Sequence, residues 1–189
     1  MDISQRLKLL NNSQKTVFKL KDLQDLWSDN VLNTKMSAKR MVGKKLLLKL
    51  AKNYYCLNKE YNIYELANLI ISPSYVSFNS ALFFKGVCFQ AQNTISSVAL
   101  FNYEKKIDNK IYKYFTMKKE LFFNLEGIIV QNNISFACPE RAILDSFYFG
   151  FLPNVDNEEK INFTFLKKIS QFYPNSVKNK IKKIYGSKV

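Results

Sequence analysis

The spacing of apolar residues in the first 57 positions constrains the fold more than any other feature of this sequence. Apolar side chains recur every three or four residues in three successive stretches, which polar residues separate. These predicted helices cover residues 1–12, 19–27 and 31–43. The third helix has Val31, Leu32, Ala38, Met41 and Val42 on its expected inward face. The preceding residues Ser28, Asp29 and Asn30 supply a turn and a candidate N-cap, and Gly43 lies at the end of the helix.

Two short apolar runs follow the third predicted helix. They span residues 46–50 and 54–57, and the polar break Ala51-Lys52-Asn53 separates them, so they are predicted to form a β-hairpin. Three helices followed by a basic hairpin are typical of a winged helix-turn-helix. The alternative is one long helix over residues 34–52, because leucine and lysine both favour helix.

The remainder of the chain predicts a second domain that mixes helices with a sheet. Helical apolar spacing over residues 63–70 and 78–82 is interrupted by Ser72-Pro73-Ser74, and Gly86 is placed to end the second helix. Strands are predicted at residues 95–100, 111–117, 128–130 and 134–136, with a polar loop at 102–110 and a turn at Asn132-Asn133. Three further helices are predicted at residues 139–149, 165–172 and 177–185.

The predicted fold class is therefore α+β. A winged helix-turn-helix domain over residues 1–57 precedes a mixed α/β domain over residues 58–189, with a small and mostly antiparallel sheet.

Positive charge is concentrated at the two ends of the chain. The formal charge is +14, of which residues 1–53 carry +8, residues 54–150 carry +1 and residues 151–189 carry +5. A basic surface attracts phosphate polymers and releases their counterions, so nucleic acid is the leading class of partner. The alternative is that abundant lysine only reflects an AT-rich genome, which does not explain the concentration at the ends.

Several enzyme classes are excluded by composition. The chain contains no histidine, which removes Ser-His-Asp and Cys-His catalysis and any histidine metal ligand. Its five glycines form no phosphate-binding loop. We therefore expect a protein that is not an enzyme and binds no cofactor or metal. A carboxylate-based nuclease and a protein-binding adaptor are the remaining alternatives, and they are distinguished by metal-dependent cleavage of DNA and by the absence of salt-sensitive DNA binding.

The expected location is the cytoplasm. Cys56, Cys88 and Cys138 are widely spaced and are predicted to be reduced and buried. No apolar leader follows Met1. The 19 uncharged residues between Glu65 and Lys85 are interrupted by polar side chains, so they are predicted to form two buried helices and a turn, not a membrane span.

Two ordered sequence blocks resemble the AbiEi-type antitoxins of abortive-infection systems. The stretch from Pro73 to Leu82 reads PSYVSFNSAL and is similar to the family block P-x-Y-I-S-x-x-S-A-L. The stretch from Cys138 to Asp145 reads CPERAILD and is similar to S-P-E-[KR]-A-L-L-D. Residues 41–57 also align with the end of the family's recognition helix and its wing, where Asn53 replaces a common glycine and tolerates a positive φ. The likeness covers roughly residues 19–150.

The resemblance implies a transcriptional regulator and antitoxin of a two-gene system. Such a protein represses its own operon by binding double-stranded promoter DNA, and it counteracts a nucleotidyltransferase-like toxin of the AbiEii kind without requiring a stable complex. Operators of this kind often contain paired half-sites, so a homodimer or two cooperating monomers on DNA is expected.

Six basic residues are the candidate DNA contacts. Those on or just after the third helix would face the major groove, and those of the hairpin would meet phosphate. Arg40 is the candidate for reading a guanine edge, because arginine can engage two acceptors at once. The alternative is a basic helix that is merely solvated. The six residues are Lys35, Lys39, Arg40, Lys44, Lys49 and Lys52.

The residues of the two family blocks are expected to be mainly structural, with a possible antitoxin role for Arg141. Ser77 is predicted to cap a helix, and Glu140 to occupy a favourable position near a helix N-terminus. Arg141 and Asp145 are spaced to form a surface ion pair, worth about 0.3–0.5 kcal/mol. The lysines at 178–183 are expected to keep a peripheral helix soluble or to extend a nucleic-acid surface. The family-block residues are Tyr75, Ser77, Ser80, Pro139, Glu140, Arg141 and Asp145.

Overall fold

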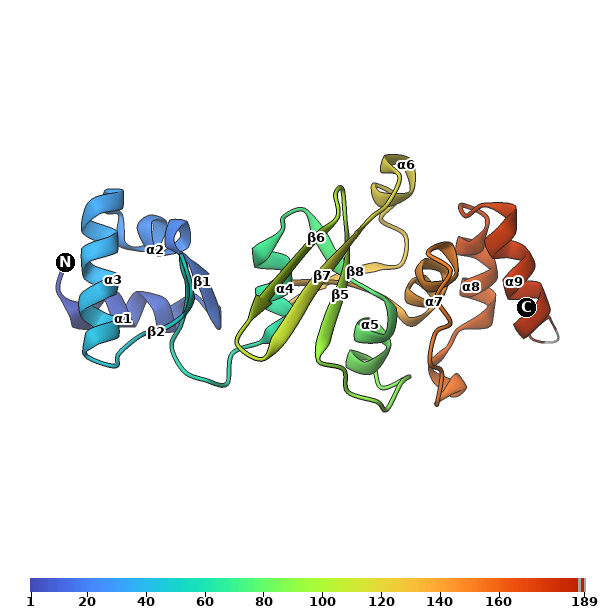
Figure 1. The fold of residues 1–189 in the computed structure, drawn as a ribbon, viewed down its shortest axis with the longest axis horizontal. Helices are drawn as coiled ribbons and strands as arrows, with labels where there is room; N and C mark the ends of the chain where they lie inside the picture. Colours follow the sequence, from blue (N-terminus) through green and yellow to red (C-terminus); the bar gives the residue numbers. More distant parts are fainter. Residues whose placement is uncertain (187, 189) are drawn as a thin grey trace. The chain divides into compact units, whose positions relative to one another are not determined.

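The computed structural model describes residues 1–186 and 188, and it has a mixed α+β fold (Figure 1). Within these residues there are nine α-helices and two sheets. The contacts of the chain divide it into two compact units, Met1–Ile70 and Ile71–Val189. The predicted α+β class is confirmed at this level.

The first unit combines four helices with a small antiparallel sheet. The strand order is β1-β3-β2, so the first strand pairs with the far strand of the hairpin. The elements are α1 (Ile3–Asn12), β1 (Val17–Lys19), α2 (Leu20–Trp27), α3 (Val31–Gly43), β2 (Leu48–Ala51), β3 (Tyr54–Cys56) and α4 (Ile63–Ile70).

Local sequence signals set the ends of these elements. The Asn30 side chain accepts a hydrogen bond of 2.8 Å from the Asn33 backbone N–H, so Asn30 is the residue of the predicted Ser28-Asp29-Asn30 turn that caps α3. Asn53 has a φ of 68° at the turn between β2 and β3, a conformation that asparagine tolerates. The alternative of one long helix over residues 34–52 is wrong, because α3 ends at Gly43 and a hairpin follows.

The core of the first unit is a single apolar cluster contributed by its helices and its sheet. The buried face of α3 consists of Thr34, Ala38 and Met41, which share one side of a helix with 3.6 residues per turn. The prediction that Val31 and Leu32 face inward is wrong, since both are exposed. The cluster comprises Leu10, Phe18, Leu23, Trp27, Ala38, Met41, Leu47 and Tyr55.

Helix α4 belongs to the first unit because it is bound to β1 and the residue before it. Glu65 is buried, and its Oε2 accepts hydrogen bonds from the backbone N–H and the hydroxyl of Thr16, at 3.0 and 2.6 Å. The Thr16 hydroxyl in turn accepts a hydrogen bond from the Asn62 N–H. The contacts therefore divide the chain after Ile70, whereas the sequence placed the domain boundary after Leu57.

The second unit is built on a six-stranded sheet with the order β6-β7-β5-β4-β9-β8. Three of its strand pairs are antiparallel and two are parallel, so the sheet is mostly antiparallel, as predicted. Helix α7 packs against α5, α8 and α9. The elements are β4 (Ser74–Val76), α5 (Phe78–Phe84), β5 (Thr94–Ala99), β6 (Tyr103–Ile107), β7 (Lys110–Thr116), α6 (Lys119–Phe122), β8 (Ile128–Gln131), β9 (Ile134–Ala137), α7 (Pro139–Tyr148), η1 (Glu158–Lys160), α8 (Phe163–Ser170) and α9 (Asn175–Tyr185).

Several sequence expectations for the second unit hold, and others do not. The turn between β8 and β9 places Asn132 and Asn133 at positive φ, as the hairpin prediction requires. The predicted polar loop at 102–110 is wrong, because most of it forms strand β6. The predicted helix over residues 165–172 ends earlier than expected, because α8 ends at Ser170.

Two predictions about burial and membrane crossing are settled by the fold. The 19 uncharged residues between Glu65 and Lys85 are divided among α4, β4 and α5, so the expected pair of helices also has a short strand between them. None of the helices in residues 1–186 is both long enough and apolar enough to cross a bilayer. Cys56, Cys88 and Cys138 are free and buried, which confirms the prediction of unpaired thiols.

Candidate nucleic-acid interface

Helix α3 presents one face to the core of the first unit and the other to solvent. Thr34, Ala38 and Met41 are buried, and the positions on the opposite side of the helix are exposed. Asn30 fixes where the helix begins, and the contacts of Met41 with the core fix its rotation about its own axis. Any contact that α3 makes outside this unit must therefore come from its solvent-facing side.

All six predicted DNA-contacting residues are exposed in the structure. Three lie on α3, one directly follows it, one lies in β2, and one lies in the turn of the hairpin. The helix and the hairpin are adjacent, because the Leu46 N–H donates to the Met41 carbonyl at 3.0 Å and Leu47 joins the same core. In this order the residues are Lys35, Lys39 and Arg40, then Lys44, Lys49 and Lys52.

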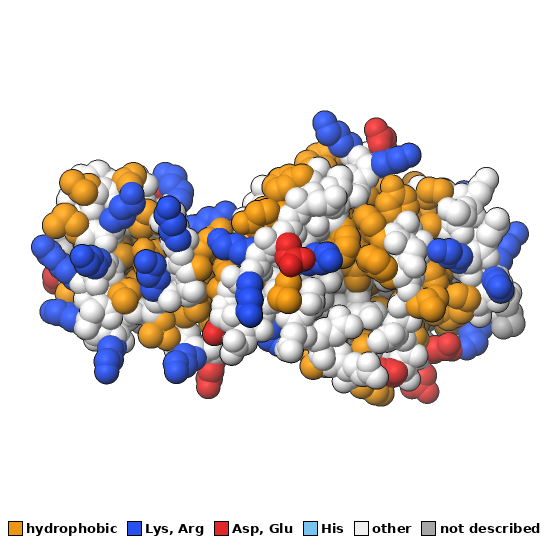
Figure 2. Space-filling view, viewed as in Figure 1, with side chains coloured by type: hydrophobic (Ala, Val, Ile, Leu, Met, Phe, Trp, Pro, Cys, Tyr) orange, Lys and Arg blue, Asp and Glu red, His pale blue; other side chains and the backbone are white. Residues whose placement is uncertain are grey.

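The segment that carries these residues contains no acidic side chain. Between Asp29 and Glu60 the sequence has eight Lys and Arg residues and no Asp or Glu. Among the charged side chains over the first unit, Figure 2 shows mostly blue ones on the face that it displays. Among the described residues, no ion pair involves any of the six candidate side chains. Their positive charge is therefore available to an external anion.

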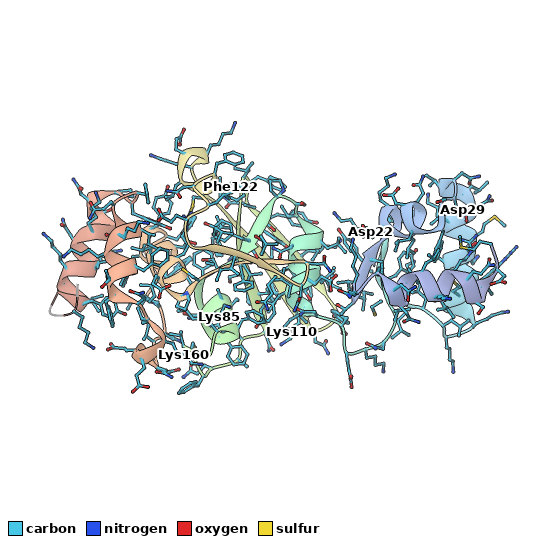
Figure 3. All side chains as sticks on the ribbon, turned by 180° about the vertical axis from the view of Figure 1, so that it is seen from behind. Asp22, Asp29, Lys85, Lys110, Phe122 and Lys160 are labelled. Carbon is cyan, nitrogen blue, oxygen red and sulfur yellow. The ribbon has the colours of Figure 1, made fainter. Side chains whose placement is uncertain are left out.

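The carboxylates near the start of the unit are engaged elsewhere. Asp29, labelled in Figure 3, pairs with the buried guanidinium of Arg6 at 2.5 Å. That guanidinium also lies 4.7 Å from the centre of the Trp27 ring. Asp22 accepts from the Lys19 N–H and pairs with Lys15. These contacts tie acidic groups to α1 and α2, so they leave the charge of α3 and the hairpin uncompensated.

The two strands of the hairpin differ in how far their side chains are buried. Lys49 lies opposite Tyr55 and is exposed, whereas Tyr55 is buried in the core. An irregularity between Lys49 and Ala51 shifts the register just before the turn that carries Lys52. The hairpin thus anchors an apolar strand against the unit and leaves its lysines in water.

In the second unit, the two sequence blocks that resemble AbiEi proteins meet in one buried cluster. Arg141 on α7 and Asp145 one turn later are both 0% exposed, with Nε and Oδ1 3.4 Å apart. Asp145 accepts hydrogen bonds from the Ser77 hydroxyl at 2.7 Å and the Tyr173 hydroxyl at 2.5 Å. The Arg141 guanidinium donates to the Tyr75 hydroxyl at 3.3 Å.

The same guanidinium also holds the segment around α6. Its two terminal nitrogens donate to the backbone carbonyls of Leu121, Asn124 and Glu126 at 2.8, 3.0 and 3.2 Å. The segment has few regular hydrogen bonds of its own, since α6 is only four residues long. Arg141 therefore supplies donors to carbonyls that a longer helix would satisfy internally.

The cluster corrects two predictions made from the sequence. The predicted surface ion pair between Arg141 and Asp145 is in fact fully buried. Ser77 does stand at the N-cap position of α5, but its side chain makes no capping hydrogen bond; its hydroxyl donates to Asp145. Sequence distance hid this contact, since 68 positions separate the two residues.

The other block residues also have structural partners. Glu140 is buried, and its carboxylate accepts a hydrogen bond of 2.7 Å from the Asn162 N–H. The Ser80 hydroxyl accepts from the Ser96 N–H and donates to the Thr94 carbonyl. Pro139 occupies the first turn of α7, where a missing N–H costs nothing.

Burial raises the pKa values of three acidic groups in the cluster. It raises the pKa of the Asp145 carboxyl, while Arg141 and the hydroxyls of Ser77 and Tyr173 oppose that rise. Burial, together with the negative charge of Asp145, raises the pKa of Tyr75 and Tyr173 well above 10.0. These groups are closed to solvent, so the arrangement suits support of the fold better than chemistry on a substrate.

In residues 1–186 and 188, no group of three or more Cys, Asp or Glu side chains could hold a metal ion.

Three exposed residues of α3 were not identified from the sequence. Leu32, Asn33 and Met36 lie on its solvent-facing side, among the predicted basic residues. Two helical phases fit the apolar pattern of this segment, and the predicted phase turns Leu32 inward. The polar Thr34 occupies the buried position instead, with its hydroxyl donating to the Asn30 carbonyl at 2.8 Å.

Comparison with known proteins adds no relative. Neither the protein-family models nor the curated proteins searched include a match to this chain.

Proposed function

We propose that this chain is a DNA-binding transcriptional regulator whose first unit acts as a winged helix-turn-helix. In this proposal α2 and α3 form the helix-turn-helix, and β2 with β3 forms the wing. The observation that carries it is the acid-free basic surface of α3 and the hairpin, in which all six candidate side chains are exposed. A folded surface with uncompensated positive charge binds the phosphates of DNA.

The proposed contacts follow the dimensions of DNA. A helix such as α3 fits the major groove, where Lys39 and Arg40 would extend toward the floor and its edges. Lys44, Lys49 and Lys52 would contact phosphates that flank the groove. Arg40 has the strongest capacity for sequence choice, because its guanidinium can donate two parallel hydrogen bonds to guanine.

We further propose that the regulator represses its own operon and serves as the antitoxin to a nucleotidyltransferase-like toxin. The two sequence blocks similar to AbiEi-type antitoxins support this part of the proposal. Side chains of the two blocks form hydrogen bonds with each other in one buried cluster. This contact would explain why the two blocks occur in the same chain. A homodimer, or two cooperating monomers, on paired half-sites is part of the same proposal.

A mobility-shift titration on the DNA upstream of the protein's own gene tests the repressor function. Scrambled DNA of the same length is the competitor, and both are titrated at two salt concentrations. We expect tighter binding to the upstream DNA, weakened by Arg40→Ala by about 5- to 150-fold, the range for one bidentate base contact. Lys8→Ala is the matched control, since Lys8 is an exposed cation of α1 outside the proposed interface.

Other outcomes would support the alternative functions. Equal and salt-labile binding to both DNAs would indicate a general nucleic-acid binder. No binding to either DNA would indicate a protein-binding adaptor. Cleavage of DNA upon addition of a divalent metal would indicate a nuclease.

Co-expression tests the antitoxin function separately. A neighbouring gene that encodes a nucleotidyltransferase-like protein should arrest growth when induced alone, and this chain should restore growth. The Arg40→Ala variant should still restore growth if neutralisation does not depend on DNA binding. Failure of the wild-type chain to restore growth would overturn the antitoxin function and leave the repressor function standing.

A further inference from the structure

The solvent-facing side of α3 is apolar in its first half and basic in its second half. Leu32 is 67% exposed and Met36 is 47% exposed, so both expose large apolar side chains to water. They are followed by Lys39 and Arg40, which are also exposed. Most other large apolar side chains of this unit are at least partly buried, Met1 and Val31 being the exceptions, so this adjacent pair requires an explanation.

The positions of these residues define a stripe. With 100° of rotation per residue, Leu32 and Met36 lie almost directly opposite Ala38 and Met41. Lys35 and Lys39 border the stripe on one side, and Asn33 and Arg40 border it on the other. Leu32 and Met36 therefore form the part of α3 that projects farthest from the core, with cations on both sides.

Recognition helices generally place their N-terminal residues against the edges of the bases. The major groove offers one prominent apolar group, the 5-methyl group of thymine. We propose that Leu32 and Met36 are specificity-determining residues that contact thymine methyl groups and so select A·T base pairs. This inference rests on the proposed DNA-binding function and extends it to the class of sequence that is read.

The surrounding charge favours DNA over a second copy of this chain as the occupant of the stripe. Two copies meeting through this face would bring Lys35, Lys39 and Arg40 close to the same residues of the other copy, and like charges at an interface are unfavourable. Duplex DNA instead supplies phosphates on both sides of the groove. The arrangement of an apolar stripe between two basic borders matches that of a groove between two phosphate backbones.

The test compares two duplexes that differ only in the thymine methyl group. One duplex consists of alternating dA and dT, and the other of alternating dA and dU, which has the same hydrogen-bonding edges. The full-length protein is titrated with each by fluorescence anisotropy. Burial of one methyl group corresponds to about a fourfold change in affinity. We expect the dT duplex to bind more tightly by about this factor for each methyl group contacted.

Variants identify the residues responsible. The double variant Leu32→Ala and Met36→Ala should lose the preference for dT while it still binds both duplexes in a salt-dependent way. Met36→Leu, which keeps an apolar side chain, should retain the preference. Val31→Ala is the matched control, because Val31 is also 47% exposed on α3 but lies beside the buried face. Circular dichroism should show unchanged helix content in each variant.

Each remaining outcome overturns a defined part of the inference. Equal binding of both duplexes by the wild-type protein would overturn the thymine contact but leave DNA binding intact. A preference that persists in the double variant would assign it to other residues and overturn the roles of Leu32 and Met36. Absence of binding to any duplex would overturn the proposed DNA-binding function, and the thymine contact with it.

Discussion

The buried side chain of Arg141 connects three separate parts of the second unit. Its guanidinium is bound to the carboxylate of Asp145, to the hydroxyl of Tyr75 and to backbone carbonyls around α6. The side chains of Arg141 and Asp145 are both fully buried. The energy of their ion pair is therefore offset by the cost of removing two charges from water. Loss of one partner alone leaves the other charge buried and uncompensated.

Substitution of Arg141 should therefore destabilise the protein strongly. We expect Arg141→Met to lower the free energy of unfolding by about 3–5 kcal/mol, measured by urea denaturation. The matched control is Lys168→Met, which removes a cation from the exposed pair with Glu126 and should cost less than about 1 kcal/mol. Adding Asp145→Leu to Arg141→Met should recover part of the loss. An Arg141→Met variant as stable as the wild type would contradict this account.

Buried groups that hold their protons should make the protein sensitive to alkali. Burial raises the pKa of Cys138 from 9.0 to about 12, and it raises the pKa of Tyr75 and Tyr173 well above 10.0. Above pH 9.0 the unfolded chain loses protons that the folded chain keeps, so unfolding is increasingly favoured as pH rises. The contribution of these groups to stability is complete below pH 9.0 and declines above it.

We expect the free energy of unfolding to fall between pH 9.0 and 12, by at most about 1.4 kcal/mol per pH unit for each group. Urea denaturation at several pH values measures this slope, and Cys138→Ala should reduce it. Tyrosinate absorbance should show that part of the tyrosine signal appears only as the protein unfolds. A stability that is constant across this range would show that these groups titrate normally in the folded state.

Among the elements, the β2–β3 hairpin depends on the backbone of one residue. Asn53 adopts a φ of 68°, and its carbonyl accepts a hydrogen bond of 2.9 Å from the Leu20 N–H at the start of α2. The turn therefore positions both the hairpin and the helix that follows β1. A side chain branched at Cβ would be strained in this conformation, whereas glycine would not.

Substitutions at this turn should follow backbone preference. Asn53→Val should lower the stability by about 1–2 kcal/mol, and Asn53→Gly should leave it within about 0.5 kcal/mol of the wild type. Thermal denaturation compares the two, with Lys52→Ala as the control at the neighbouring exposed position. Equal stability of the valine and glycine variants would mean that the turn relaxes to a different backbone conformation.

Sequence patterns predicted the long elements better than the short ones, for physical reasons. Residues 31–43 form a helix with a clear cap, and the Asn132-Asn133 turn carries its own conformational signal. Strands β1 and β4 are only three residues long, so alternation has no room to appear. Strand β6 is an edge strand whose residues are mostly polar on both faces, which resembles a loop in sequence.

The site was predicted in part. The six basic residues were identified because charge is visible in the sequence, and all are exposed. Leu32 and Met36 were missed because an apolar residue on a helix is normally assigned to the core. The contact of Ser77 with Asp145 was missed because it depends on how β4, α5 and α7 come together, which local periodicity does not encode.

For the whole molecule, distribution of charge matters more than its total. Residues 1–70 contain 13 basic and 6 acidic side chains, and residues 71–189 contain 16 and 9, so each unit carries +7. In the first unit, the segment between Asp29 and Glu60 contains eight basic side chains and no carboxylate side chain. In the second unit, acidic residues occur among the basic ones, and several form ion pairs. This difference is why the proposed nucleic-acid surface lies in the first unit.

The extent of the first unit leads to a prediction about truncated chains. Its apolar cluster lies entirely between Leu10 and Tyr55, so a fragment of residues 1–57 contains every member. Helix α4 nevertheless packs on β1, and Glu65 accepts both hydrogen bonds donated by Thr16. Truncation before α4 would expose the buried strand residues Val17 and Phe18 to more water and would remove these hydrogen bonds.

We therefore expect a fragment of residues 1–70 to unfold cooperatively and to bind DNA with the salt dependence of the full chain. A fragment of residues 1–57 should be less stable by roughly 2 kcal/mol or more, since each lost hydrogen bond to a charged group contributes about 1.5–3 kcal/mol. Urea denaturation followed by circular dichroism compares the two fragments, and Glu65→Ala in residues 1–70 removes both hydrogen bonds that the Glu65 carboxylate accepts from Thr16. Equal stability of the fragments would place the boundary of the proposed DNA-binding unit at Leu57, because α4 would then contribute nothing to it.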